Sequence, residues 1–122
     1  MNEKKAVRAI NVAMKELNQY LTDLVHNISC YTSDEVARTA EISALHEVRI
    51  EYLEKLKLAV KGKVSKEAYM ALRLTSLERG ITEILYLDYI DFDEIDMTKE
   101  ERKRYKEICD ACDLINEAEY YL

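Results

Sequence analysis

The sequence predicts an all-α protein, an antiparallel up-down-up-down four-helix bundle that forms a single domain over residues 1–122. The chain has no proline and only two glycines, while 48% of its residues are hydrophobic and 34% are charged. A composition so poor in helix breakers favours long helices with short connections. In addition, apolar residues recur at steps of three and four in four segments, which short turn signals separate.

The first helix is expected over residues 3–30. Its apolar stripe consists of Val7, Ile10, Met14, Leu17, Leu21, Leu24 and Ile28. Because charged and apolar residues alternate through the first 21 positions, this segment reads as neither a signal peptide nor a membrane span. The three cysteines also do not form a secreted disulfide framework. We therefore expect a cytoplasmic protein with no membrane partner.

The second helix is expected over residues 33–61. Thr32 is its N-cap, and Glu35 completes a capping box. Gly62 follows as the residue that ends the helix. One face of the helix consists of Ala37, Ala40, Ala44, Val48, Tyr52, Leu56 and Ala59. The small alanines near its start are expected to allow close approach of a neighbouring helix.

The third helix is expected over residues 66–90, after Ser65 as N-cap. Its apolar stripe widens towards the end until it covers nearly the whole circumference. A helix that is apolar all round must be covered on more than one side. This segment is therefore either the central helix of the bundle or a contact with another chain. The predicted interface for a partner or a second copy consists of Leu85, Tyr86, Leu87, Tyr89 and Ile90.

The last helix is expected over residues 99–121, with a loop over residues 88–97 before it. Thr98 and Glu101 form a second capping box. The inner face of this helix consists of Tyr105, Ile108, Cys109, Cys112 and Ile115.

No motif in the chain indicates an enzyme, a cofactor or a metal site. Cys109-x-x-Cys112 is the nearest candidate, but it lies inside a helix on the apolar stripe, where cysteines pack as small hydrophobic residues. The pair His46-Glu47 begins a zinc-protease motif, but Ile50 stands where the second histidine is required. Two glycines cannot form a glycine-rich phosphate loop. We expect a non-enzymatic protein.

The net charge of −6 and the pI of about 5.0 argue against a generally basic nucleic-acid-binding surface. Basic residues nevertheless gather in two segments that an up-down bundle would bring to one end. These residues are Lys4, Lys5, Arg8, Lys55, Lys57, Lys61, Lys63 and Lys66. They form either a binding patch or a solvated helix end that uses lysines for capping and solubility.

Three segments carry a resemblance to a known family: AVKGKVSK at residues 59–66, AYMALRLTSLERGITEILYLDYI at residues 68–90, and Met97-Thr98 at the start of the last helix. With the helix lengths, they make residues 42–122 similar to the accessory variability determinant proteins of diversity-generating retroelements. The related bundles encoded by intervening sequences in large-subunit ribosomal RNA genes are similar too.

The resemblance implies a non-catalytic bundle that assembles into a homo-oligomeric ring, commonly a pentamer. It also implies binding to the retroelement reverse transcriptase and its template RNA, with the eight basic residues as nucleic-acid contacts. The chain departs from the family in its acidic pI and in lacking a glycine-rich, tryptophan-containing end of the last helix. A rival hypothesis is a small acidic inhibitor that blocks a basic groove on a partner. Its phosphate-mimicking residues would be Asp88, Asp91, Asp93, Glu94 and Asp96.

Overall fold

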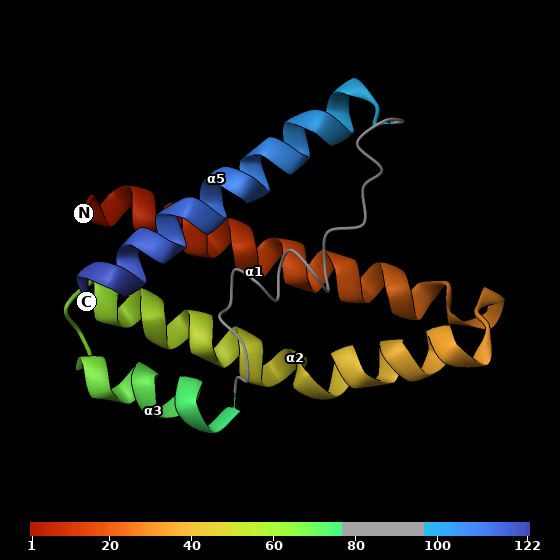
Figure 1. Ribbon diagram of the computed structural model, residues 1–122, viewed down its shortest axis with the longest axis horizontal. Coiled ribbons are helices and arrows are strands. Elements are labelled where there is room, and N and C mark those ends of the chain that lie inside the picture. The colour runs from red at the N-terminus through yellow and green to blue at the C-terminus, as the bar shows by residue number, and fades with distance from the viewer. Residues whose placement is uncertain (77–96) are drawn as a thin grey trace.

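The computed structural model describes residues 1–76 and 97–122. Its elements are α1 (Glu3–His26), the short 3-10 helix η1 (Ile28–Cys30), α2 (Ser33–Val60), α3 (Lys66–Ser76) and α5 (Lys99–Tyr121) (Figure 1). The described residues contain no strand, so the predicted all-α class is confirmed. The up-down-up-down topology and the single domain stay predictions. The predicted third helix lies outside the described residues beyond Ser76.

Two helices begin at the predicted threonine caps. The Thr32 hydroxyl oxygen accepts a hydrogen bond from the Glu35 backbone N–H at 3.3 Å, and the Glu35 carboxylate accepts one from the Thr32 N–H at 3.5 Å. The Thr98 hydroxyl oxygen accepts from the Glu101 N–H at 3.1 Å. These bonds satisfy backbone donors that the first turn of a helix leaves unpaired.

The first helix ends at His26, earlier than predicted. The Asn27 side-chain amide donates to the carbonyl oxygen of Asp23 at 2.9 Å, and the chain continues as η1. Asparagine stops a helix in this way because its side chain competes with the backbone for hydrogen bonds.

The second helix ends in a Schellman motif around Gly62, as its sequence predicts. Gly62 has a φ of +72°. Its N–H donates to the Ala59 carbonyl oxygen at 3.0 Å, and the Lys63 N–H donates to the Leu58 carbonyl oxygen at 2.9 Å. Glycine suits this left-handed position because it has no Cβ to clash with the backbone.

Helix α1 packs against both α2 and α5, and α3 packs on α2 (Figure 1). α1 and α2 lie side by side and run in opposite directions. Side chains of all four helices form one core, whose largest fully buried members are Tyr52, Tyr69, Ile10, Leu17, Leu53, Leu56 and Ile115. The segment after Val64 was predicted to be either the central helix of the bundle or a contact with another chain, and most of it lies outside the described residues. Among the described helices, α1 lies between two long neighbours, α2 and α5.

The predicted face of α2 is wrong in its first half, because Ala37, Ala40 and Ala44 are exposed. Thr39 and Arg49 are buried instead, at 4% and 3% exposure. The Thr39 hydroxyl donates to the Glu35 carbonyl oxygen at 2.8 Å, which satisfies it inside the helix. Alanines bury little apolar area, so the larger aliphatic side chains of α2 decide which face turns inward. Within the described residues, no helix is long and apolar enough to cross a membrane.

Candidate functional site

Four helix ends lie together at one end of the molecule. Figure 1 shows the start of α1, the end of α2, the start of α3 and the end of α5 grouped near both chain termini. We call residues 1–8, 54–67 and 117–122 the basic end. These segments hold eight lysines and arginines against five glutamates, a net side-chain charge of +3 in a chain whose net charge is −6. All eight predicted nucleic-acid contacts belong to them.

Most of these cations face solvent. Lys4, Lys5, Arg8, Lys61, Lys63 and Lys66 are exposed, whereas Lys55 and Lys57 are half-buried. The Lys57 ammonium donates to the Asn11 side-chain carbonyl oxygen at 3.1 Å and so connects α2 to α1. No ion pair joins any of the eight to another residue within the described parts of the chain. Their charges are therefore available to an anionic ligand.

Two tyrosines at the end of α5 complete the basic end. Tyr120 is 81% exposed and Tyr121 is 63% exposed. Their rings meet edge to face, with centroids 5.1 Å apart and an interplanar angle of 90°. Exposed aromatic rings beside unpaired cations are the two components of a single-strand nucleic-acid surface. The sequence has nine tyrosines and does not show which of them face solvent.

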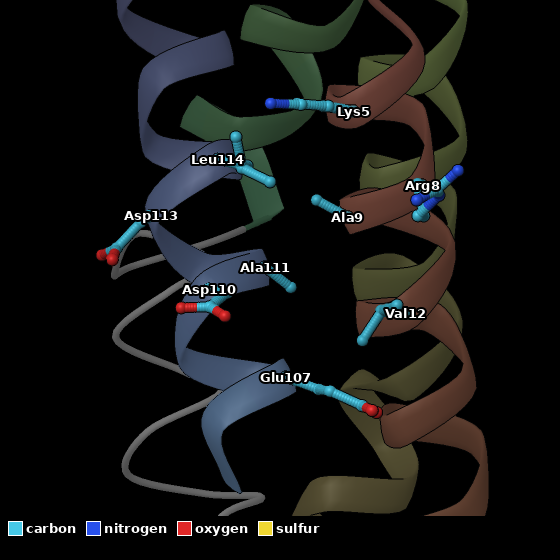
Figure 2. Close-up of a pocket in the computed structure, with 9 residues that line it drawn as sticks. All are labelled: Lys5, Arg8, Ala9, Val12, Glu107, Asp110, Ala111, Asp113 and Leu114. Carbon is cyan, nitrogen blue, oxygen red and sulfur yellow. The ribbon is translucent and has the colours of Figure 1, made fainter. Parts of the chain in front are cut away.

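A groove of about 650 Å³ lies between α1 and α5, close to the basic end (Figure 2). Ala9 and Val12 of α1 face Ala111 and Leu114 of α5 across it. The two alanines are almost fully buried, and Val12 and Leu114 are half-buried. The groove therefore has a narrow apolar floor formed by small side chains. Sequence reasoning missed it, because it depends on how α1 and α5 pack.

The rims of this groove carry opposite charges. Lys5 and Arg8 lie on the α1 rim, and Glu107, Asp110 and Asp113 lie on the α5 rim. Figure 2 shows Lys5 and Glu107 reaching towards the opposite helix at the two ends of the groove. Two of the eight predicted nucleic-acid contacts thus lie opposite three carboxylates, which repel phosphate. We expect these two to contribute less to nucleic-acid binding than the lysines of the α2–α3 turn.

An ion pair joins α1 and α5 beyond the groove. The Arg104 guanidinium donates to one Glu16 carboxylate oxygen from Nε at 2.9 Å and from a terminal nitrogen at 2.6 Å. The hydrogen bond to Glu16 raises the pKa of Arg104. In the sequence, the basic group Arg102, Lys103, Arg104 and Lys106 follows the acidic segment 88–96, which predicts that the two neutralise each other. Those residues lie outside the described part of the chain, whereas Arg104 is bound to Glu16.

The cysteines and histidines form no metal-binding group among the described residues. Cys112 is fully buried, Cys109 is half-buried and Cys30 is exposed. Burial raises the pKa of Cys112 to about 12, with smaller contributions from Cys109 and Asp113. A thiol in this state is a poor nucleophile at neutral pH. Cys112 therefore packs in the core, whereas Cys109 lies at its edge.

The predicted partner interface over residues 85–90 lies outside the described residues, as do the five acidic residues of the inhibitor hypothesis. Comparisons of this chain with protein-family models, curated proteins and solved structures found no match. The proposals below therefore depend on the residues and their geometry.

Proposed function

We propose that this protein is a non-enzymatic helical scaffold that forms a homo-oligomer and binds single-stranded RNA at its basic end. As the family resemblance implies, its protein partner would be a retroelement reverse transcriptase. The observation that carries the proposal is the combination, at one end of an acidic molecule, of unpaired lysines and two exposed, adjacent tyrosines.

The charge distribution supports binding at this end. The rest of the chain carries a net charge more negative than −6, because the basic end is positive. Phosphates are therefore repelled from the acidic parts of the surface and attracted to regions of net positive charge such as this end. Lysines without acidic partners can contact phosphates without first breaking an ion pair.

The tyrosine pair favours a single strand over a duplex. An unpaired base can stack on an exposed aromatic ring, and such stacking tolerates any base sequence. In a duplex the bases are already stacked on one another and only the phosphates remain within reach. The basic end is therefore expected to bind single-stranded RNA more tightly than a hairpin of the same length.

The proposal is tested by fluorescence anisotropy with a labelled 15-nucleotide RNA. The triple variant Lys61→Gln, Lys63→Gln, Lys66→Gln removes three exposed cations. If each contacts one phosphate, the slope of log affinity against log salt falls by about 2, because each contact contributes about 0.7 for a single strand. The matched control replaces Lys99, Lys103 and Lys106, three exposed lysines near the start of α5, by glutamine.

The two triple variants separate the outcomes. Weaker binding in the first and unchanged binding in the second supports the basic end as the RNA site. Equal losses of RNA affinity in both variants would show that RNA is attracted to surface lysines in general, and this would contradict the proposal. Absence of RNA binding even at low salt would contradict it as well, and would favour the acidic inhibitor hypothesis.

A further inference from the structure

The groove between α1 and α5 is a second site, separate in chemistry from the basic end. Its floor is apolar, and Figure 2 shows Lys5 and Glu107 extending across it. The lining also includes Arg8 on the α1 side and Asp110 and Asp113 on the α5 side. Its volume of about 650 Å³ is within the range of protein pockets that hold ligands, about 300–1,000 Å³. The lining residues run from Lys5 to Val12 on α1 and from Glu107 to Leu114 on α5, a length of about 10 Å, or two helical turns.

The rim charges are not used within the described structure. No ion pair crosses the groove between Lys5 or Arg8 and the three α5 carboxylates, as far as the described residues extend. Val12 and Leu114 keep part of their apolar surface in water. A ligand that covers them gains from apolar burial, and one that also reaches both rims gains charge pairing in a partly desolvated site.

We propose that this groove binds an amphipathic helix of a partner protein, with acidic side chains along the edge that faces α1 and basic side chains along the edge that faces α5. Lys5 and Arg8 are three residues apart, and so are Glu107 and Asp110. A bound helix running along the groove can match both rows with residues spaced by three or four. The alanine floor leaves room for leucine-sized side chains at the same spacing.

A second copy of this chain fits the groove less well. Two grooves facing each other can pair their charges, because the basic rim of one copy then meets the acidic rim of the other. Their recessed alanine floors, however, would remain apart and unfilled. A single convex helix fills the floor and reaches both rims. Nucleic acid is disfavoured by the three carboxylates.

The test uses a synthetic 18-residue helical peptide with leucines at positions i, i+4, i+7 and i+11, glutamates along one flank and lysines along the other. Exchanging the flanks is not a control, since that peptide could bind in the reverse direction. The matched control peptide has glutamates on both flanks. Titration calorimetry with the full chain is expected to show binding of the mixed-charge peptide and at least about tenfold weaker binding of the all-acidic one.

A charge exchange identifies the groove as the binding site. Asp110→Lys is expected to weaken the mixed-charge peptide about tenfold and to strengthen the all-acidic peptide, because the α5 rim then attracts glutamates. The matched control Glu41→Lys makes the same change of charge at an exposed position on α2 and is expected to change neither affinity. Circular dichroism confirms that both variants keep their helices.

A groove-filling variant completes the experiment. Val12→Trp is expected to abolish peptide binding without changing the mass of the protein in solution. Loss of peptide binding together with a smaller mass would show that a second copy occupies the groove and would overturn the proposal. If Asp110→Lys binds both peptides with the same affinities as the wild type, the proposal is overturned too. RNA binding by the lysines of the α2–α3 turn is a separate measurement, so either proposal can fail alone.

Discussion

At the level of single residues, His46 lies in an environment that disfavours its charged form. One ring nitrogen, Nε2, donates to the Asn18 side-chain carbonyl oxygen at 2.7 Å. The other, Nδ1, is buried and has no hydrogen-bond partner among the described residues. Burial lowers the pKa of His46 below 6.5, the Arg49 charge lowers it further, and Glu47 partly opposes them. A proton on Nδ1 would have no acceptor.

This arrangement predicts a loss of stability in mild acid. As the pH falls through about 6.5, the unfolded chain takes up a proton at His46 before the folded chain does, so the free energy of unfolding decreases. Above that pH His46 is neutral in both the folded and the unfolded chain, so its protonation no longer changes the free energy of unfolding. Urea denaturation at pH 7.5 and 5.5 measures it. His46→Gln is expected to lose less stability over this interval than the wild type.

The control for this prediction is His26→Gln, which removes the exposed histidine at the end of α1. It should leave the pH dependence close to that of the wild type. If the His46 variant shows the same pH dependence as the wild type, the pKa of His46 is not lowered and the prediction is wrong.

The three cysteines are expected to differ sharply in reactivity. The thiolate is the reactive form of cysteine. Cys112 is fully buried and its pKa is raised to about 12, whereas Cys30 is exposed. A disulfide reagent added to folded protein at pH 8 should modify Cys30 at once and Cys112 only after unfolding in urea. The variant Cys30→Ser should remove the fast phase. A fast reaction at Cys112 in folded protein would contradict this prediction.

Residue-level predictions succeeded where a side chain behaves as its type usually does. Cys112 and Ile115 were predicted as core and are buried. Arg49 could not be predicted, because arginine is rarely buried without a partner and the sequence gives no sign of one. The exposure of Tyr120 and Tyr121 could not be predicted either, because tyrosine occurs both in cores and on surfaces.

At the level of helices, the clearest prediction concerns the end of α2. Gly62 has a φ of +72°, and a Cβ added there would meet no atom within 4 Å outside Gly62 and its two chain neighbours. The cost of Gly62→Ala is therefore one of backbone conformation and not of collision, and we expect a loss of about 1 kcal/mol in the free energy of unfolding. Gly62→Asn should lose less, because asparagine tolerates this conformation better than alanine. Urea denaturation measures both.

Equal losses in the two Gly62 variants would show that the backbone conformation is not the cause. No loss in either would show that the left-handed turn is absent in solution.

The sequence predicted a helix boundary correctly where a capping residue next to that boundary determines it. The last helix spans the predicted residues 99–121, and α2 starts at its capping box. The premature end of α1 depends on one competing hydrogen bond from Asn27, which periodicity does not reveal. The rotation of α2 was mispredicted at its alanines, because the packing of larger side chains sets it. The groove between α1 and α5 could not be predicted, since it requires the relative position of two helices far apart in sequence.

At the level of the whole molecule, apolar side chains are exposed both at the basic end and on α2. Net positive charge gathers at the basic end, and the exposed apolar side chains on α2 include Val36 at 38% and Leu45 at 36%. Exposed apolar groups on a soluble helix favour contact with another chain. The sequence predicts a stronger apolar surface over residues 85–90. Both features are consistent with the proposed oligomer, and they predict different interfaces.

Light scattering coupled to size exclusion is expected to give a discrete oligomer, with a pentamer of the 14.3 kDa chain at about 72 kDa. An apolar interface is not weakened by salt, so the mass should be the same at about 0.1 M and about 1 M salt. The double variant Leu85→Glu, Ile90→Glu should dissociate it, because burying glutamates without partners is unfavourable.

The matched variant Leu45→Glu distinguishes the two interfaces, because it places the same charge on the exposed side of α2. If the predicted interface is correct, this variant keeps the wild-type mass while the double variant becomes a monomer of unchanged helicity. If Leu45→Glu alone dissociates the oligomer, the interface lies on α2 and not at residues 85–90. A wild-type monomer at both salt concentrations would contradict the ring that the family resemblance implies. It would leave the basic end and the α1–α5 groove as sites on a single chain.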